Sequence, residues 1–270
     1  MAVILGGNDT LPQIALTQSQ TFVPPQDGNI CIHVIGAGGG GNGGDQNGAS
    51  GGAGGYCKKN SLAVTTASSF TVVIGVGSSG QDGDSNSTAG GNSTVAGTGL
   101  SATLTANGGS GGGGSNNETG GAGGAASNGD VNNTGGAGGS GGQDGGGGAV
   151  GVYGTGEAGA GNNPYEAGSS DAMGPSGFSG FGQIVGDRGG LGKGSGTGGA
   201  AGTFPVSARG DGGFLSGGAQ VRGTAGTSAD FMMGGCSLIG GGGGGCKTNV
   251  SNSIGGHGGD GIVLIQYLPS

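Results

Sequence analysis

Glycine constrains the folding of this chain more than any other feature, because it occupies 83 of the 270 positions, against a usual share of about 7%. A glycine has no side chain to bury and loses more backbone entropy on folding than any other residue. No window of the sequence has the i, i+3, i+4, i+7 apolar spacing of an amphipathic helix. A helical fold is therefore not expected, and disorder is the alternative that an ordered fold must overcome.

Two features oppose disorder. Charged residues make up only 8% of the chain, so self-repulsion is weak, and apolar segments lie at both ends of the glycine-rich stretch. A β-branched run at residues 30–35 follows a turn at 26–29 and predicts a strand, and residues 261–268 predict another. Because these two strands can pair in one sheet, we expect them to hold the glycine-rich middle in place.

Three more segments have strand character. They are residues 56–64, 70–76 and 100–106, and the last alternates apolar and polar residues with period two, as a strand with one buried face does. From about residue 107 to 261, glycine runs alternate with short segments rich in Asn, Ser, Thr and Asp. Glycine does not recur strictly at every third position and there are only seven prolines, which excludes a collagen triple helix.

Glycine runs can adopt an extended threefold helix related to polyproline II, with about 9.3 Å per turn and no internal hydrogen bonds. Such helices pack side by side, because their N–H groups bond to neighbouring segments. The expected fold is therefore mostly β and irregular: a polyglycine-II helix bundle closed by a small sheet or sandwich of N- and C-terminal strands. We expect an extended attachment arm at 1–20, a strand-rich part at 21–106, and the bundle with its loops and the C-terminal strand at 107–270.

Several segments together resemble a known family, the glycine-rich domains of phage tail-fibre proteins and adhesins. The resemblance covers residues 21–270 and rests on segments 22–24, 32–41, 51–56, 70–77, 90–95, 104–109, 240–245 and 255–267. It implies a polyglycine-II bundle closed by β-strands in a virion fibre or tip protein. It also implies that receptor specificity lies on loops at one end of the bundle.

Charge and hydropathy argue against several partners. The net charge is −8, with seven Lys and Arg and no basic cluster, so nucleic acid is not expected to bind. No stretch approaches the ~20 apolar residues of a membrane span, and the first eight residues lack the basic and apolar regions of a secretory signal. We expect localisation on virus particles, reached by release of the assembled virion.

No catalytic, cofactor or metal site is expected. His33 lies in a predicted strand and His257 in a glycine run, and neither has a nucleophile and an acid in a recognisable arrangement. The cysteines are too irregularly spaced for a zinc site, and three pairings or free buried thiols are all compatible with the sequence. The cysteines are Cys31, Cys57, Cys236 and Cys246.

Loops with aromatic or large apolar side chains are the candidate receptor contacts, because rings supply stiff contact area and stack on sugars. The alternative is that these side chains fill a small side core, which is equally compatible with the sequence. The candidates are Tyr165, Met173, Phe178, Phe181, Phe204, Phe214 and Phe231.

The sequence thus favours a viral (phage) fibre or tail-tip protein that binds a host receptor, either a cell-surface glycan or a protein. Other fibre or tail proteins would attach through the arm at 1–20, and a homo-oligomer is possible in this setting. The alternative is a purely structural virion component: a decoration, a head fibre or a connector. An ice-binding protein is less favoured, because the polar interruptions vary in length and character.

Overall fold

The computed structural model describes part of the chain, and every structural statement below refers to that part. The described residues are 2–5, 13–44, 48–82, 85–114, 119–140, 155–156, 158–159, 232–233, 240–243, 246–247 and 253–269. They form strands, turns and extended segments, and no helix occurs among them. This agrees with the mostly-β prediction.

A six-stranded antiparallel sheet joins the two ends of the domain. Its order is β1 (Ala2–Leu5), β2 (Gln13–Leu16), β16 (Ile262–Tyr267), β4 (Gly28–Ile35), β6 (Tyr56–Val64) and β12 (Val131–Asn133). The C-terminal β16 lies between β2 and β4, with Ile265 opposite Ile14 on one side and Ile32 on the other. The predicted pairing of the two terminal strands is confirmed. Residues 2–5 and 13–16 of the expected arm belong to this sheet, and the arm's attachment role stays a prediction.

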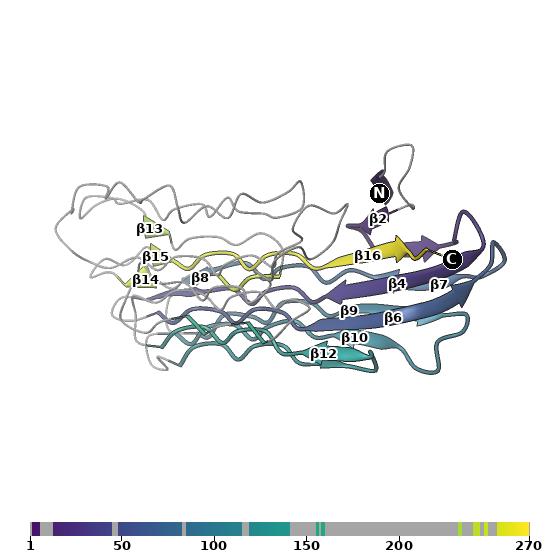
Figure 1. Cartoon of the computed structure of the whole chain (residues 1–270). Coiled ribbons are helices and arrows are strands. Elements are labelled where there is room, and N and C mark those ends of the chain that lie inside the picture. The colour runs from purple at the N-terminus through teal and green to yellow at the C-terminus, as the bar shows by residue number, and fades with distance from the viewer. Residues whose placement is uncertain are drawn as a thin grey trace, which may run out of the picture.

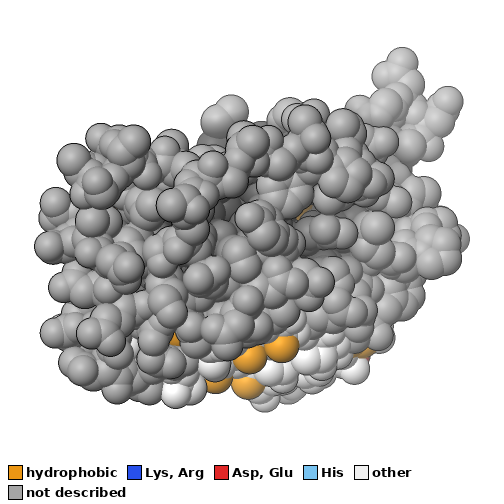
Figure 2. All heavy atoms as spheres, turned by 90° about the vertical axis from the view of Figure 1, so that its left-hand side faces the viewer, with side chains coloured by type: hydrophobic (Ala, Val, Ile, Leu, Met, Phe, Trp, Pro, Cys, Tyr) orange, Lys and Arg blue, Asp and Glu red, His pale blue; other side chains and the backbone are white. Residues whose placement is uncertain are grey.

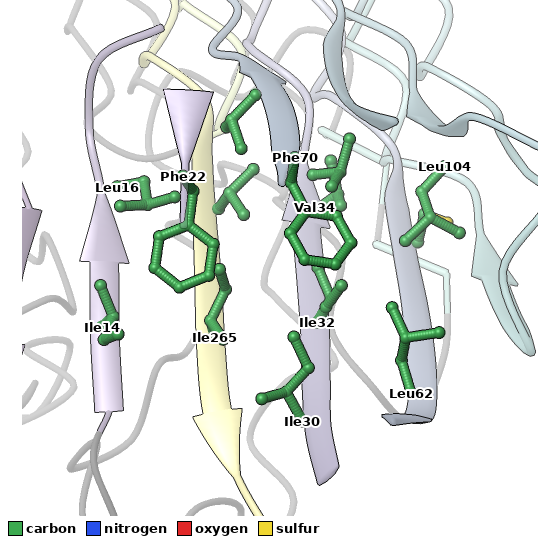
Figure 3. Close-up of a cluster of buried hydrophobic side chains, with 14 of the residues drawn as sticks. Ile14, Leu16, Phe22, Ile30, Ile32, Val34, Leu62, Phe70, Leu104 and Ile265 are labelled. Atoms are coloured by element: carbon green, nitrogen blue, oxygen red, sulfur yellow. The ribbon is translucent and has the colours of Figure 1, made fainter. Parts of the chain in front are cut away.

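A five-stranded antiparallel sheet packs against the first. Its order is β11 (Ala126–Ser127), β10 (Leu104–Ala106), β9 (Ser93–Gly97), β7 (Phe70–Val73) and β3 (Gln20–Phe22). The facing side chains of the two sheets form the core drawn in Figure 3, where Phe22 and Phe70 lie with ring centroids 6.3 Å apart. Alternate residues of each strand point inward, as period-two patterning requires.

Strand boundaries differ from prediction where a side chain or turn interrupts the ladder. Strand β6 has the predicted bounds, but β7 ends at Val73, and the next amide, that of Ile74, donates to Ser19 Oγ at 2.9 Å. The segment predicted at 100–106 is a strand only from Leu104, because residues 97–102 turn around Gly99, whose φ is +79°. A positive φ of this kind favours glycine and ends a strand.

Several strands of the two sheets continue into glycine segments. Strand β4 runs on as residues 36–42, and the chain returns through 49–55 into β6; β7 likewise continues as 75–81 and returns through 86–92 into β9. Residues 107–114 and 119–125 connect β10 to β11 in the same way. Figure 1 shows the result: the sheets and both termini lie at one end, and the extended segments run toward the other.

Backbone hydrogen bonds join the glycine segments with a period of three residues. From segment 36–42, residues 36, 39 and 42 donate to 55, 52 and 49; residues 37 and 40 donate to 91 and 88; residues 38 and 41 donate to 259 and 256. Its carbonyl groups accept from segments 75–81 and 107–114 and from Gly243. Segment 36–42 is therefore bonded to six different parts of the chain, and its own N–H groups bond to none of its own carbonyls.

Glycine is required where these segments touch. A Cβ atom on Gly38 would lie 1.8 Å from the carbonyl oxygen of Gly241, and one on Gly36 would lie 2.2 Å from that of Asn107. No L side chain fits at such distances, so the absence of Cβ atoms is what allows the backbones to approach. The structure thus replaces side-chain packing by backbone contact in this half of the molecule.

The glycine segments extend the two sheets as two layers. Segments 75–81, 86–92, 107–114 and 119–125 bond in that lateral order and continue the five-stranded sheet. Behind them, segments 255–261, 36–42, 49–55 and 134–140 continue the six-stranded sheet. Residues 240–243 bond to segments 36–42, 49–55 and 255–261 and to no segment of the first layer, so they begin a third layer. The sandwich at one end and the glycine layers at the other are therefore one continuous body.

Candidate functional site

The paired glycine segments end together at the end of the molecule away from the termini. The described ends there belong to segments 36–42 and 49–55, to 75–81 and 86–92, and to 107–114 and 119–125. Short parallel strands lie at this end: β5 (Asn42–Gly44) between β8 (Gln81–Asp82) and β14 (Cys246–Lys247), and β13 (Met232–Met233) beside β15 (Ser253–Ile254). We call this the distal end.

Polar side chains tie the distal connections to the backbone. Ser87 Oγ donates to the Gly41 carbonyl at 2.7 Å, and the Asn42 side-chain amide donates to the Ser85 carbonyl. The Gly114 amide donates to Asn86 Oδ1 at 3.2 Å. These bonds link successive connections, so the described parts of the distal end are held together as one structure rather than as separate loops.

Figure 2 looks onto the distal end. The described side chains visible in this view are hydrophobic or uncharged, and they lie together along its lower border. Asn42 Oδ1 is buried and has no hydrogen-bond partner among the described atoms.

The aromatic and apolar residues predicted as receptor contacts all lie outside the described residues. They are Tyr165, Met173, Phe178, Phe181, Phe204, Phe214 and Phe231. Their contact role stays a prediction. Nothing in the sequence distinguishes the small polar residues at the distal end, because Asn and Ser between glycines are also typical of ordinary turns.

A buried polar cluster lies within the six-stranded sheet. His33 Nδ1 is 2.6 Å from the Tyr56 hydroxyl, and His33 Nε2 is 3.2 Å from Cys31 Sγ. Burial, with the nearby Lys58 charge, lowers the pKa of His33 to about 3, and burial raises the pKa of the Cys31 thiol to about 11. Near neutral pH the imidazole and the thiol are both uncharged and inaccessible, so this pair lacks the thiolate that nucleophilic catalysis needs.

Cys31 and Cys57 are both free and buried. Cys57 Sγ donates to the Ser127 carbonyl at 3.3 Å, and burial raises the pKa of this thiol to about 11. For these two residues the free-thiol alternative left open by the sequence therefore holds. The side chains of Cys236 and Cys246 lie outside the described part.

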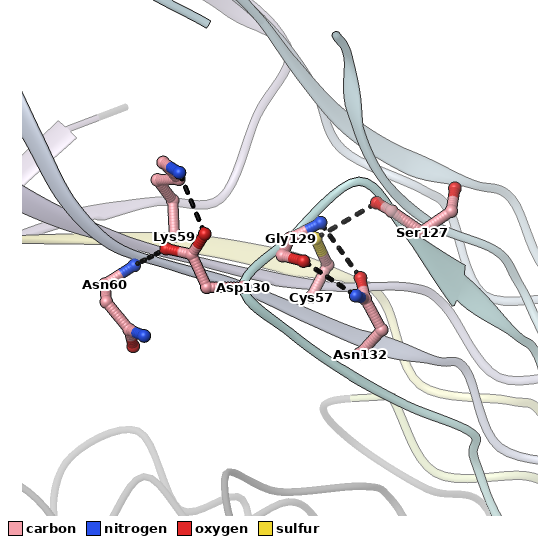
Figure 4. Close-up of polar contacts among 7 residues, drawn as sticks. All are labelled: Cys57, Lys59, Asn60, Ser127, Gly129, Asp130 and Asn132. Atoms are coloured by element: carbon pink, nitrogen blue, oxygen red, sulfur yellow. Dashed lines mark hydrogen bonds and ion pairs between the residues drawn. The ribbon is translucent and has the colours of Figure 1, made fainter. Parts of the chain in front are cut away.

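Asp130 organises the turn between β11 and β12 (Figure 4). Its carboxylate accepts from Lys59 Nζ and from the Asn60 amide, both at 2.8 Å, and these two donors hold the pKa of Asp130 below its usual range. The Asn132 side chain bonds both the amide and the carbonyl of Gly129. This is a structural turn that fastens β12 to β6, because every polar group named is used within it.

The described residues contain no group of three or more His, Cys, Asp or Glu side chains that could hold a metal ion. Within the same residues, no helix is long and apolar enough to cross a membrane.

The geometry defines a class of protein: a β-sandwich scaffold lengthened by backbone-bonded glycine segments that present their connections at one end. The chain belongs to the glycine-rich domain family, whose sequence model matches residues 15–268. No protein of curated function matches the sequence. The family agrees with the glycine-rich part of the resemblance seen in the sequence.

Proposed function

We propose that this protein is the receptor-binding tip of a viral (phage) fibre, in which a polyglycine-II bundle holds binding loops at the distal end. The observation that carries the proposal is that the paired glycine segments end together at the end of the molecule opposite both termini. Termini at one end leave the other free to meet a ligand when the chain is attached to a larger particle.

The threefold bonding pattern supports the polyglycine-II part of this proposal. A polyglycine-II helix has three residues per turn and no internal hydrogen bonds, so successive residues must bond to three different neighbours. Residues 36–42 alternate their donors among three neighbouring segments in this way. Close contacts between Cα–H groups and carbonyl oxygens would contribute about 0.5–1 kcal/mol each to such packing.

Rigidity supports the binding role. Loops that bind ligands lose conformational entropy when they are ordered, so a scaffold that fixes their ends beforehand reduces that cost. The glycine segments that lead to the distal end are each bonded to several neighbours. The ligand class is a host cell-surface glycan or protein, and the arm at 1–20 would attach to other fibre or tail proteins.

The experiment is binding of the purified, labelled protein to candidate host cells. The test variant changes Tyr165, Phe178 and Phe181 to Ala, and the matched control changes Gln26, Thr66 and Ser101, which are exposed residues at the sheet end, to Ala. Both variants are first checked for an unchanged unfolding midpoint. Loss of binding in the test variant alone places the contact on the aromatic segment.

Unchanged binding by the test variant would move the contact to other residues, and the next variants would change Ser85 and Asn86 at the distal end. Absence of binding by the unchanged protein would contradict the receptor-binding role. The alternative is then a structural virion component, for which the same rigid scaffold suffices. In that case deletion of residues 1–12 should abolish incorporation into particles, while the aromatic variant should be incorporated normally.

A further inference from the structure

One face of the molecule is built from exposed, small and uncharged residues. In the five-stranded sheet, one set of alternate residues is buried in the core and the other set points away from the six-stranded sheet. The outward residues are partly or fully exposed. They are Thr21, Val23, Thr71, Val73, Thr94, Ala96, Thr103, Thr105 and Ser127.

The same face continues along the glycine segments. Segments 75–81, 86–92, 107–114 and 119–125 are bonded from behind by segments 36–42 and 49–55, so only their far side is exposed. Every third residue is the most exposed, and the positions between these are mostly glycine. The outward residues are Val76, Ser79, Asn86, Ala89, Asn92, Asn107, Ser110, Thr119, Ala122 and Ala125. We call the two sets together the neutral face.

The residues that form the neutral face are uncharged, and the Asp260 carboxylate, which accepts from the Gly77 amide at 2.7 Å, lies at its edge beside Val76. Residues 19–24, 70–81, 85–114 and 119–127, which supply it, contain no Asp, Glu, Lys or Arg. A solvated sheet face normally mixes charged residues among its polar ones. The three exposed large hydrophobic residues among the described part also lie here: Val23 at 52%, Val73 at 41% and Val76 at 71% exposure. Depletion of charge together with exposed apolar side chains is the composition of an interface centre.

We propose that the neutral face is the contact surface for a second copy of this chain. The chain has a net charge of −8, so two copies repel each other unless they meet through a surface without charge. A flat face of small side chains is complementary to itself, which a two-fold dimer requires. The distal connections and the termini would both remain accessible in such a dimer.

The size of the face fits this partner. Four or five strands and segments, spaced about 4.8 Å apart, give a width of roughly 20 Å. Four residues of strand and about seven of extended helix give a length of roughly 35 Å. The resulting area of roughly 700 Å² per copy is close to the ~800 Å² per partner of a standard interface.

The test is the mass of the full chain in solution, measured by sedimentation equilibrium at tens of micromolar. The proposal expects a dimer for the unchanged protein and a monomer for a variant with Thr71→Glu and Thr105→Glu, with dimerisation weakened about 100-fold or more. The matched control adds the same two charges at Ser61 and Ala63, exposed residues of β6 in the other sheet, and should remain dimeric. Circular dichroism confirms that both variants are folded.

A second measurement separates loss of contact from damage to the face. Mixing the Thr71→Glu, Thr105→Glu variant with a Thr71→Lys, Thr105→Lys variant should restore a mixed dimer, because opposite charges then meet across the interface. A monomeric unchanged protein at these concentrations would overturn the proposal and leave the face for a different partner. A dimer that survives the two glutamates would overturn it equally.

Discussion

Gly39 and Ser110 approach so closely that a Cβ atom on Gly39 would stand 2.0 Å from the carbonyl oxygen of Ser110. The Gly39 amide at the same time donates to the Gly52 carbonyl at 2.9 Å. Position 39 is thus fixed by backbone on two sides, and this relationship recurs along the glycine layers.

Replacing Gly39 by alanine should destabilise the protein by about 3 kcal/mol, because backbone cannot move aside as a flexible side chain could. The free energy of unfolding, measured with urea, checks this value. Ala122 points outward and is exposed, so Ala122→Ser is the matched control and should change stability by less than about 0.5 kcal/mol. Equal effects at the two positions would contradict the close-packed arrangement.

The His33 cluster predicts that stability depends on pH. Because the folded pKa of His33 is lowered to about 3, the unfolded state binds more protons between about pH 6.5 and pH 3. Stability should therefore be complete above pH 6.5 and should fall as the pH drops through that range, by up to about 5 kcal/mol. Urea unfolding at a series of pH values measures the loss.

A spectroscopic readout assigns this effect to His33. The imidazole carbon resonances of His33, identified by comparison with a His33→Gln variant, should stay those of a neutral ring down to about pH 4. Protonation of the ring near pH 6.5 in the folded protein would contradict its burial.

Asn128 is the described non-glycine residue with a positive φ, +67°, and its side-chain amide donates to the Thr103 carbonyl at 2.8 Å. Asn128→Ala should cost about 2 kcal/mol, because alanine tolerates this left-handed backbone poorly and also loses the hydrogen bond. Asn128→Gly also loses this hydrogen bond, but glycine adopts a positive φ readily. It should therefore reduce the free energy of unfolding by about 1 kcal/mol less than Asn128→Ala does. Thermal unfolding of the two variants compares them directly.

Cys31 and Cys57 should react with an aromatic disulfide reagent only when the protein unfolds, because both thiols are buried and their pKa values are raised to about 11. The measurement uses a variant in which Cys236 and Cys246 are serine, so that only these two thiols are present. Rapid labelling at pH 8 without denaturant would show that the sheets are more open than described. A control variant without any cysteine, in which Cys31 and Cys57 are also replaced by serine, gives the background signal.

The core strands could be predicted from the sequence because their pattern is local. The β-branched run before Gly36 and the alternating pattern around Phe70 carry enough apolar side chains to define a strand and its buried face. Strand β9 was not predicted, because Ser93–Gly97 contains a single large apolar residue, and its strand character depends on pairing with β7 and β10. The candidate aromatic residues remain predictions, since they lie outside the described part.

Triplets of one side-chain-bearing residue followed by two glycines indicate an exposed face, which the overall glycine content does not reveal. Around Ser110 and Ala122, side chains appear at every third position with glycine between them, and those positions are the exposed ones. A threefold segment packed on one side has one outward residue per turn. The triplets therefore specify an outer face as clearly as alternation does in a strand.

The sequence by itself determined that this chain forms strands rather than helices, that its two terminal strands can pair, and that glycine must serve where backbones touch. Only the tertiary structure decided which segments lie side by side: that residues 36–42 bond to six other parts of the chain, and that strands such as β4 and β7 continue into glycine segments. The physical reason is that side chains identify their partners by shape, whereas the N–H and C=O groups of one glycine are the same as those of any other. Glycine runs therefore require close neighbours but do not determine which segments these are. The pairing of the strands to which the runs are joined determines it.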